Sequence, residues 1–233
     1  MKPPRLGILG GTFDPIHNGH LNAASAALKA LRLTDVLFVP SNVPPHRKTK
    51  PKASAHHRLK MTTLATANND RFRVSDLELR APVPSYTSRT LQQVAHEGYA
   101  PAELFFITGS DAFLEIKHWY DYPELLNRSN FIVISRPGLP ASTLPNQLPS
   151  LKSRMNLITD ASQLVTDASP STAIWLVDAA TSNASSSDIR KGLEAGSSVS
   201  NMLPPLVESY IFKQLLYRNP PLKETHTLSL IHI

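Results

Sequence analysis

The segment Leu6–Leu21, with the sequence LGILGGTFDPIHNGHL, constrains the fold of this chain more than any other stretch. An apolar run, Leu6–Leu9, leads directly into two glycines, as when a buried parallel strand ends in a loop with unusual backbone angles. Pro15 excludes regular helix from that loop. Asn18 is a favourable N-cap for the Ala- and Leu-rich run Gly19–Leu31. The segment therefore predicts a strand, a glycine turn and a helix N-terminus, in that order.

This order of elements creates an anion site. The unpaired N–H groups of the first helical turn and the positive end of the helix dipole face the carboxyl end of the sheet, where phosphate is the natural guest. His17 and His20 are three residues apart at the helix start, so both imidazoles can donate toward the same anion. Gly19 between them would let a flat or bulky ligand group approach the backbone closely.

Other uses of the same residues were weighed. The two histidines could instead bind zinc, but zinc needs further ligands, and the chain has no Cys and no HExxH motif. The glycines could serve only as a turn. The dinucleotide fingerprint GxGxxG and the P-loop pattern are both absent, so neither of those phosphate cradles applies.

Beyond this unit, predicted strands and helices alternate, which indicates a Rossmann-like α/β fold with a parallel sheet and helices on both faces. Ligands of such sheets bind beyond the carboxyl ends of the strands, where the strand order reverses. The further predicted strands are Asp35–Pro40, Phe72–Leu77, Glu103–Thr108, Phe131–Ser135 and Ile174–Val177. The predicted helices are Ser54–Ala67, Ser88–His96, Ala112–Ile116, Pro123–Leu126, Ser187–Ala195 and Pro204–Leu216.

Two segments lack these patterns. Residues 137–170 are rich in Pro, Ser and Thr with little periodicity, which predicts a long surface excursion. Residues 219–233 are predicted to be a disordered tail. Their last six, LSLIHI (228–233), resemble a translated transposon-adapter end from sequencing libraries. We therefore interpret them as a read-through scar and exclude them from the fold prediction. Residues 1–218 are predicted to form a single domain.

Charge and composition narrow the classes of partner and compartment. The net charge of +6 and the pI near 9.6 suit nucleic acid, anionic lipid or small phosphorylated substrates, and the basic residues are scattered rather than bunched. There is no run of eighteen apolar residues and no signal-peptide pattern. The lack of Cys excludes disulfides and fits a reducing compartment. We therefore expect a cytoplasmic protein without membrane contact.

The block GGTFDPIHNGHL resembles the signature of the HxGH nucleotidyltransferase superfamily. In this wording it is most similar to the nicotinate-mononucleotide adenylyltransferase family of bacterial NAD biosynthesis. The resemblance covers roughly Leu6–Leu216, with several motifs in matching order. It implies the nucleotidyltransferase version of the Rossmann-like fold, with ATP and nicotinate mononucleotide as substrates.

A basic loop follows the second predicted strand. It reads PSNVPPHRK, and its paired prolines stiffen a loop that presents His46, Arg47 and Lys48. In the family this loop flanks the phosphates. A basic loop can equally be a solvated surface, and the residues alone do not separate the two interpretations.

The stretch Phe105–Tyr120 carries further candidates. Asp111 sits just past an apolar strand, where a carboxylate can accept hydrogen bonds from ribose hydroxyls or a base, or can cap the next helix. Trp119 can stack on a pyridine or simply cover the core. The family resemblance implies stacking by Trp119, with the nicotinate carboxylate received by backbone N–H groups of Thr87 and Tyr120.

The late stretch SSSDIR (Ser185–Arg190) resembles the family pattern SSTxIR, with Ser187 in place of the usual Thr. Hydroxyls and free N–H groups at a helix start bind phosphate oxygens, and Arg190 adds a planar, permanent charge. From the residues alone, a capping box without any ligand is an equal alternative.

Together these observations predict transfer of AMP from ATP to nicotinate mononucleotide, by in-line attack and without a covalent intermediate. Mg²⁺ is expected, held mainly by ATP oxygens and water, with no protein ligands. The predicted catalytic residues are His17, His20, His46, Arg47 and Arg190. The predicted ATP-binding residues are Gly10, Gly11, Thr12, Phe13, Gly19, Gly109, Asp111, Ser186 and Ser187. The predicted pyridine-nucleotide-binding residues are Ser85, Tyr86, Thr87, Trp119 and Tyr120.

Three alternatives stay open at this stage. The acceptor could be nicotinamide mononucleotide, since backbone donors tolerate an amide oxygen. It could be phosphopantetheine, although that substrate has no use for Trp119 as a pyridine platform. The alternative from another class is a basic RNA-binding module or a synthetase-like fragment, because HxGH also resembles the ATP site of class I tRNA synthetases. Against it stand the small size of the chain and the absence of a KMSKS stretch or an RNA-reading aromatic motif. We expect no nucleic-acid partner and leave a homo-oligomer open.

Overall fold

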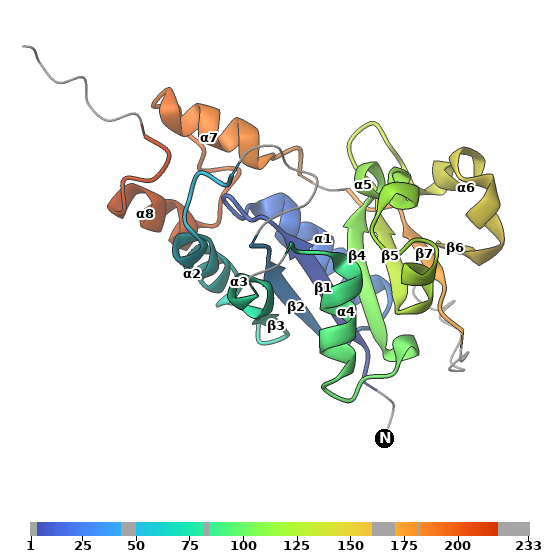
Figure 1. Cartoon of the computed structure of the whole chain (residues 1–233). Helices are drawn as coiled ribbons and strands as arrows, with labels where there is room; N and C mark the ends of the chain where they lie inside the picture. The colour runs from blue at the N-terminus through green and yellow to red at the C-terminus, as the bar shows by residue number, and fades with distance from the viewer. Residues whose placement is uncertain (1–3, 43–49, 82–83, 160–170, 181, 219–233) are drawn as a thin grey trace, which may run out of the picture.

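A parallel sheet with helices on both of its faces organises the chain (Figure 1). The computed structural model describes residues 4–42, 50–81, 84–159, 171–180 and 182–218. Within them, seven strands follow the order β3-β2-β1-β4-β5-β7-β6, and all neighbours are parallel. The predicted α/β fold is confirmed.

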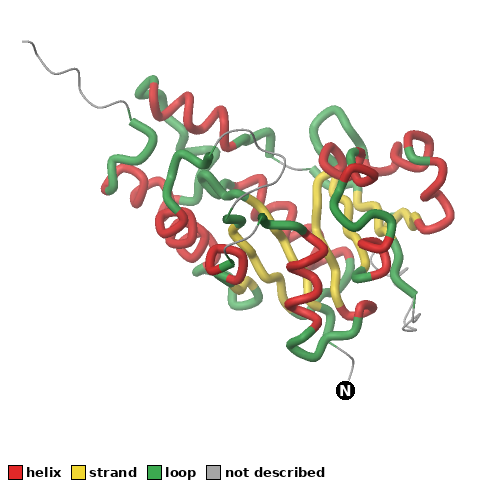
Figure 2. The backbone as a smooth tube through the Cα atoms, viewed as in Figure 1, coloured by secondary structure: helices red, strands yellow, loops and turns green. Residues whose placement is uncertain are grey.

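The strands form where short apolar runs occur, because a strand covered on both faces must be apolar throughout. The central strands are almost fully buried, and Figure 2 shows all the strands as one yellow layer between helices. The strands are β1 Leu6–Gly11, β2 Asp35–Pro40, β3 Phe72–Val74, β4 Leu104–Gly109, β5 Asn130–Ile134, β6 Met155–Ile158 and β7 Ile174–Val177.

The helices divide between the two faces of the sheet. Buried residues of α1, α2, α7 and α8 share one hydrophobic cluster, whereas those of α4, α5 and α6 share the other. The helices are α1 Asn18–Ala30, α2 Ala55–Thr66, α3 Leu77–Arg80, α4 Thr87–Ala95, α5 Ser110–Leu114, α6 Leu144–Gln147, α7 Ser186–Glu194 and α8 Pro205–Lys213. Short 3₁₀ turns lie at Pro101–Glu103, Ile116–His118, Glu124–Asn127, Ala141–Thr143 and Pro149–Arg154. In the described ranges we find no helix long and apolar enough to cross a membrane.

Two predicted element boundaries and one predicted element type were wrong, and the predicted helix Ala112–Ile116 lies two residues earlier, at Ser110–Leu114. The strand predicted to run from Phe72 to Leu77 ends at Val74, because the Ser75 hydroxyl accepts from the Leu77 N–H and the chain turns into α3. The last helix ends at Lys213, short of the predicted Leu216, because Leu215 adopts a left-handed φ of 53°. The helix predicted over Pro123–Leu126 is a 3₁₀ turn.

The predicted surface excursion over residues 137–170 was also partly wrong. Its first part carries the buried side chains of Leu144, Leu148 and Leu151, spaced as on one helical face, and then adds β6 to the sheet edge beside β7. Prolines at the starts of two short helical turns had hidden this spacing. Residues 160–170 and the predicted tail 219–233 lie outside the described residues.

The strand order reverses between β1 and β4, which pair side by side at the centre of the sheet. Their carboxyl ends, at Gly11 and Gly109, lead into α1 and α5. This is the position where ligands of open α/β sheets bind. The topology therefore places the predicted anion site after β1 next to the predicted ATP-binding residues Gly109 and Asp111.

Candidate active site

The loop between β1 and α1 takes its shape from Phe13 rather than from the two glycines. Gly10 and Gly11 belong to the extended strand, so the prediction of unusual backbone angles there was wrong. Phe13 instead has a φ of 48°, and its buried ring folds back over the strand end. A Cβ at Gly11 would lie 2.8 Å from that ring, so the glycine is required for close approach.

The start of α1 is capped by its histidines. The predicted N-cap, Asn18, is instead the first helical residue, and His17 is the N-cap. Asn18 does not cap α1, because its backbone N–H donates to the Met202 carbonyl and its side-chain amide donates to the Asn201 carbonyl. The His17 N–H donates to Nδ1 of His20 at 3.2 Å. A neutral His20 that accepts at Nδ1 carries its proton on Nε2, so it presents an N–H donor at the ring's far side.

His17 is held neutral. Its side chain is buried, and burial, followed by the positive charge of Arg136, lowers the pKa of His17 to about 4. The ring centroids of His17 and His20 are 3.8 Å apart. The expectation that both imidazoles lie on one side of the first turn agrees with this geometry, and at neutral pH both can act as hydrogen-bond donors without two adjacent full charges.

A buried arginine that the sequence analysis missed braces the loop. Arg58 of α2 is 1% exposed, and its Nη1 donates to the carbonyls of Thr12 and Ser41 at 2.7 and 2.6 Å. These carbonyls follow β1 and β2, so one guanidinium joins two neighbouring strand ends. The available signal was helical spacing, because Arg58 shares the buried face of α2 with Met61 and Thr62.

The start of α7 contacts the same loop from the other end of the chain. Ser185 caps α7 by accepting from the Asp188 N–H, while the Ser186 hydroxyl donates to the Pro15 carbonyl at 2.9 Å. Arg190 donates to the Asp14 carbonyl at 2.6 Å and to the Ser187 hydroxyl at 3.3 Å. The structure thus brings Ser186, Ser187 and Arg190 to the loop that leads to His17.

The carboxylate of Asp14 is the centre of a further contact group. One oxygen accepts from the Ala53 N–H at 3.0 Å and from the Tyr217 hydroxyl at 2.8 Å. The other accepts from the Lys52 N–H at 2.8 Å and lies 3.7 Å from Nη1 of Arg190. The side chain is 2% exposed. Three other segments of the chain therefore converge on one buried carboxylate.

The end of β4 contributes a second set. A Cβ at Gly109 would lie 2.5 Å from an Asp111 oxygen and 2.6 Å from Nε of Arg136, so this glycine allows both side chains to approach the backbone. Asp111 pairs with Arg136 at 3.3 Å. Asp111 is not an N-cap, because α5 begins one residue earlier, at Ser110. Arg136, which follows β5, was missed by the sequence analysis, and its charge acts on His17 across the strand reversal.

The predicted pyridine-binding residues form an aromatic group beside the start of α4. The rings of Tyr86 and Tyr120 stack at 4.5 Å, and the half-buried Trp119 packs edge to face on Phe106 at 6.0 Å. A Cβ at Gly10 would be 3.7 Å from the Phe106 ring, so Trp119 reaches the end of β1 through this phenylalanine.

The remaining members of this group sit at the same corner. Thr87 is the first residue of α4, and the Ser85 hydroxyl accepts from the Asn42 N–H at 3.0 Å. The aromatic group thus borders the loop after β2. The predicted residues His46 and Arg47 belong to that loop and lie outside the described residues.

This chain is similar to known proteins over most of its length. The family model described as cytidylyltransferase-like matches residues 8–192. The protein named "Probable nicotinate-nucleotide adenylyltransferase" in Moorella thermoacetica is 40% identical over 221 residues, which is 93% of each chain. One of the same name in Pectobacterium atrosepticum is 38% identical and covers 93% of this chain and 100% of its own. This chain belongs to the nicotinate-nucleotide adenylyltransferase family. The family prediction is confirmed.

Solved structures of the adenylyltransferase family share the fold. The nicotinic acid mononucleotide adenylyltransferase of Plasmodium falciparum, complexed with NaAD, superposes with a TM-score of 0.63 at 23% identity, covering 92% of this chain and 97% of its own. A second structure of that protein, complexed with APC, gives a TM-score of 0.62. At these identities, the likeness establishes the shared architecture.

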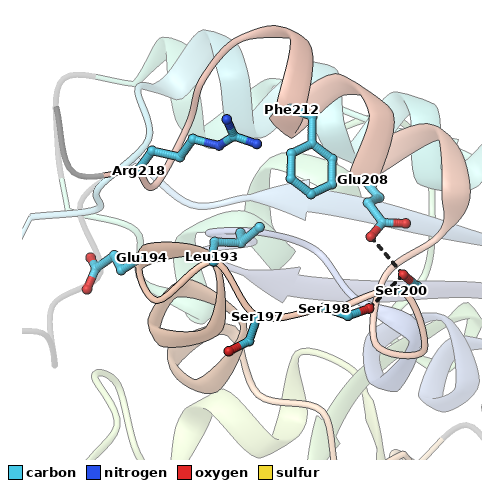
Figure 3. A pocket seen from close by; sticks show the side chains of 9 residues that line it. Leu193, Glu194, Ser197, Ser198, Ser200, Glu208, Phe212 and Arg218 are labelled. Carbon is cyan, nitrogen blue, oxygen red and sulfur yellow. Dashed lines mark hydrogen bonds between the residues drawn. The ribbon is translucent and has the colours of Figure 1, made fainter. Parts of the chain in front are cut away.

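A hollow of about 650 Å³ lies elsewhere on this adenylyltransferase fold, between the end of α7 and α8 (Figure 3). None of the predicted site residues lines it. Its walls come from Leu193, Glu194, Gly196, Ser197, Ser198, Ser200, Glu208, Phe212 and Arg218. Two carboxylates, Glu194 and Glu208, offset the charge of Arg218 in this lining, which does not favour a chain of phosphates. The predicted site residues gather instead around β1 and β4.

Proposed function

We propose that this chain transfers AMP from ATP to nicotinate mononucleotide, giving nicotinate adenine dinucleotide and pyrophosphate in NAD biosynthesis. The single observation that carries the proposal is the meeting of two helix starts at one loop, where Ser186 and Arg190 of α7 bind the Pro15 and Asp14 carbonyls just before His17. Two helix N-termini and an arginine at one strand end suit a chain of phosphates. The names of the relatives supply the same reaction.

The reaction needs alignment more than acid–base chemistry. The attacking group is the 5′-phosphate of the mononucleotide, which is already ionised at pH 7, so no general base is required. An oxygen of this phosphate forms a bond to the α-phosphorus of ATP while the bond to the leaving pyrophosphate breaks. The protein must hold two mutually repelling anions in line and stabilise the charge on the transferring and leaving oxygens.

We assign that stabilisation to the groups around the loop. The backbone amides of Gly11 and Thr12 and the N–H of His20 face the transferred phosphate, and Arg190 turns from the Asp14 carbonyl to the phosphate oxygens when ATP binds. Arg47 adds a permanent positive charge from the loop after β2, and His46 adds a further hydrogen-bond donor. His17 contributes as a neutral donor, since its lowered pKa keeps it uncharged at pH 7.

The aromatic group is assigned to the pyridine. Trp119 offers a flat face, while backbone N–H groups of Thr87 and Tyr120 receive the nicotinate carboxylate. Arg89 supports a preference for the acid over the amide, because its guanidinium lies 5.3 Å from the ring centre of Tyr86 and 5.7 Å from that of Tyr120. A permanent cation beside the carboxylate favours nicotinate over nicotinamide.

Mg²⁺ is assigned to the substrate rather than to the chain. Among the described residues, no group of three or more His, Cys, Asp or Glu side chains could hold a metal ion. The Asp14 carboxylate is already engaged by two amides and a hydroxyl. A metal that is held by ATP oxygens and water fits such a site, and when bound it would neutralise phosphate charge. We also infer a cytoplasmic location, which the absence of Cys supports.

The test is pyrophosphate release with ATP and each of nicotinate mononucleotide, nicotinamide mononucleotide and phosphopantetheine. We expect kcat/KM to be highest with nicotinate mononucleotide. A higher value with either other acceptor would reassign the substrate. Tight, salt-sensitive RNA binding without pyrophosphate release would favour the RNA-binding alternative.

A further inference from the structure

Tyr217 is the last aromatic residue of the described chain, and its position is unusual in two ways. It follows α8, and its backbone adopts a left-handed φ of 61°, which a residue without a glycine's freedom adopts only when its surroundings fix it. Its hydroxyl donates to the Asp14 carboxylate at 2.8 Å, across 203 residues of sequence. The strained turn thus directs one polar group into the loop before α1.

The hydroxyl is held as a donor. Burial, followed by the negative charge of Asp14, raises the pKa of Tyr217 above its ordinary value, so the phenol keeps its proton at any working pH. The acceptor, Asp14, is 2% exposed and bonds the amides of Lys52 and Ala53 as well. These amides immediately precede α2 and follow the basic loop of His46 and Arg47.

Arg190, the cation beside this carboxylate, has two tasks. Arg190 donates to the Asp14 carbonyl and lies 3.7 Å from its carboxylate, yet the proposed function needs Arg190 at the phosphates. When Arg190 turns away, the buried carboxylate loses a nearby positive charge and the loop loses a brace. The hydroxyl of Tyr217 has no such second task, so its bond to Asp14 is available throughout the reaction.

We propose that Tyr217 is a positioning residue that, through Asp14, holds the loop before α1 and the start of α2 in their reactive arrangement while Arg190 engages ATP. This inference rests on the proposed function. Tyr217 touches no substrate in this account. Its effect is on the placement of the amides and histidines that stabilise the charge of the transferred phosphate, so kcat depends on it more than substrate binding does.

The chain offers a matched control. Tyr210, on α8, makes a hydrogen bond of the same length, 2.8 Å, between its hydroxyl and Nδ1 of His57 on α2. Tyr217→Phe and Tyr210→Phe each remove one buried or half-buried hydroxyl contact from the C-terminal region, but only Tyr217→Phe removes a bond to the catalytic loop. A loss of general stability would affect both variants alike.

The experiment measures kcat and both KM values by pyrophosphate release from ATP and nicotinate mononucleotide, with the stoichiometry of ATP binding by calorimetry to count folded sites. For Tyr217→Phe we expect kcat per folded site about tenfold lower, with KM values within threefold of the wild type, and for Tyr210→Phe a kcat within twofold. In an Asp14→Ala background, which has no side-chain oxygen to accept the Tyr217 hydroxyl, Tyr217→Phe should change kcat less than twofold further, because both residues act through one bond.

Three results would overturn the inference. They are an unchanged kcat per folded site in Tyr217→Phe, an equal loss in Tyr210→Phe, and a full further tenfold loss in the Asp14→Ala background. Failure of the proposed function looks different, because the wild-type protein would then release no pyrophosphate with these substrates, and the positioning role would fall with it.

Discussion

The two ring nitrogens of His20 have separate roles, and substitution by Asn or by Gln can distinguish them. Nδ1 accepts a hydrogen bond from the His17 N–H at 3.2 Å, which caps α1. Nε2 carries the N–H that, in our proposal, donates a hydrogen bond to the transferred phosphate. An Asn side chain places its oxygen near the position of Nδ1 but does not reach Nε2. A Gln side chain reaches Nε2 and gives up the cap.

The magnitudes of the two effects differ enough to be distinguished. The cap is one hydrogen bond to a neutral group, which contributes about 1 kcal/mol to the free energy of unfolding. For a domain of this size that is roughly 2–4 °C in Tm. Loss of a donor to a developing oxyanion costs about 10²–10³ in kcat. His20→Asn should therefore keep its Tm within about 2 °C of the wild type and lose about 10²–10³ in kcat.

His20→Gln should show the opposite balance, with a Tm lower by roughly 2–4 °C and a kcat that falls less than in His20→Asn. The assay is pyrophosphate release at saturating ATP and nicotinate mononucleotide, run beside thermal unfolding by circular dichroism. His20→Asn with a kcat within twofold of the wild type would refute the donor role. Equal losses of kcat in the two variants would refute the division between the nitrogens.

Three further outcomes follow from the geometry. Arg58→Met should lower the free energy of unfolding, measured in urea, by about 3–6 kcal/mol, since it removes two hydrogen bonds from a charged group. The control Arg73→Met, at an exposed position, should change the free energy of unfolding little. A loss below about 1 kcal/mol in Arg58→Met contradicts the bracing role. Folding lowers the pKa of His17 from 6.5 to about 4, so between these pH values the unfolded chain binds a proton that the folded chain does not, and the free energy of unfolding falls by about 3 kcal/mol as the pH drops from 6.5 to 4. Outside that window this contribution does not change with pH. His17→Asn should remove this pH dependence, and an unchanged slope in urea titrations at different pH values contradicts the assignment. Arg89→Gln should lower the kcat/KM ratio of nicotinate to nicotinamide mononucleotide about tenfold, and a ratio within twofold of the wild type contradicts it.

Much of the fold was predictable because its central strands are short apolar runs with clear ends. Asp35–Pro40 and Ile174–Val177 were predicted to the residue. The errors fell where local hydrogen bonds or backbone angles compete with the pattern, as at Ser75 and Leu215. The edge strand Met155–Ile158 was missed because it is only four residues long and Asn156 interrupts its apolar residues.

The candidate site was predictable where a motif carried it and not where tertiary contacts did. The motif block placed His17 and His20 at a helix start, but it could not show that His17 is buried and neutral, which depends on packing and on Arg136. Arg58 and Tyr217 act from α2 and from beyond α8, far from any motif. Nothing in a single sequence pairs residue 14 with residue 217, since such contacts are set by how the two final helices return to the sheet.

The bonds from Pro15 to Ser186 and from Asp14 to Tyr217 have a consequence for synthesis of the protein. The loop before α1 is translated 171 residues before Ser186 and 203 residues before Tyr217, which make the contacts that shape it. A ribosome-bound chain that has not released α7 and Tyr217 lacks those contacts. Nucleotide binding should therefore arise only once α7 and Tyr217 have left the ribosome, rather than grow gradually as the sheet assembles.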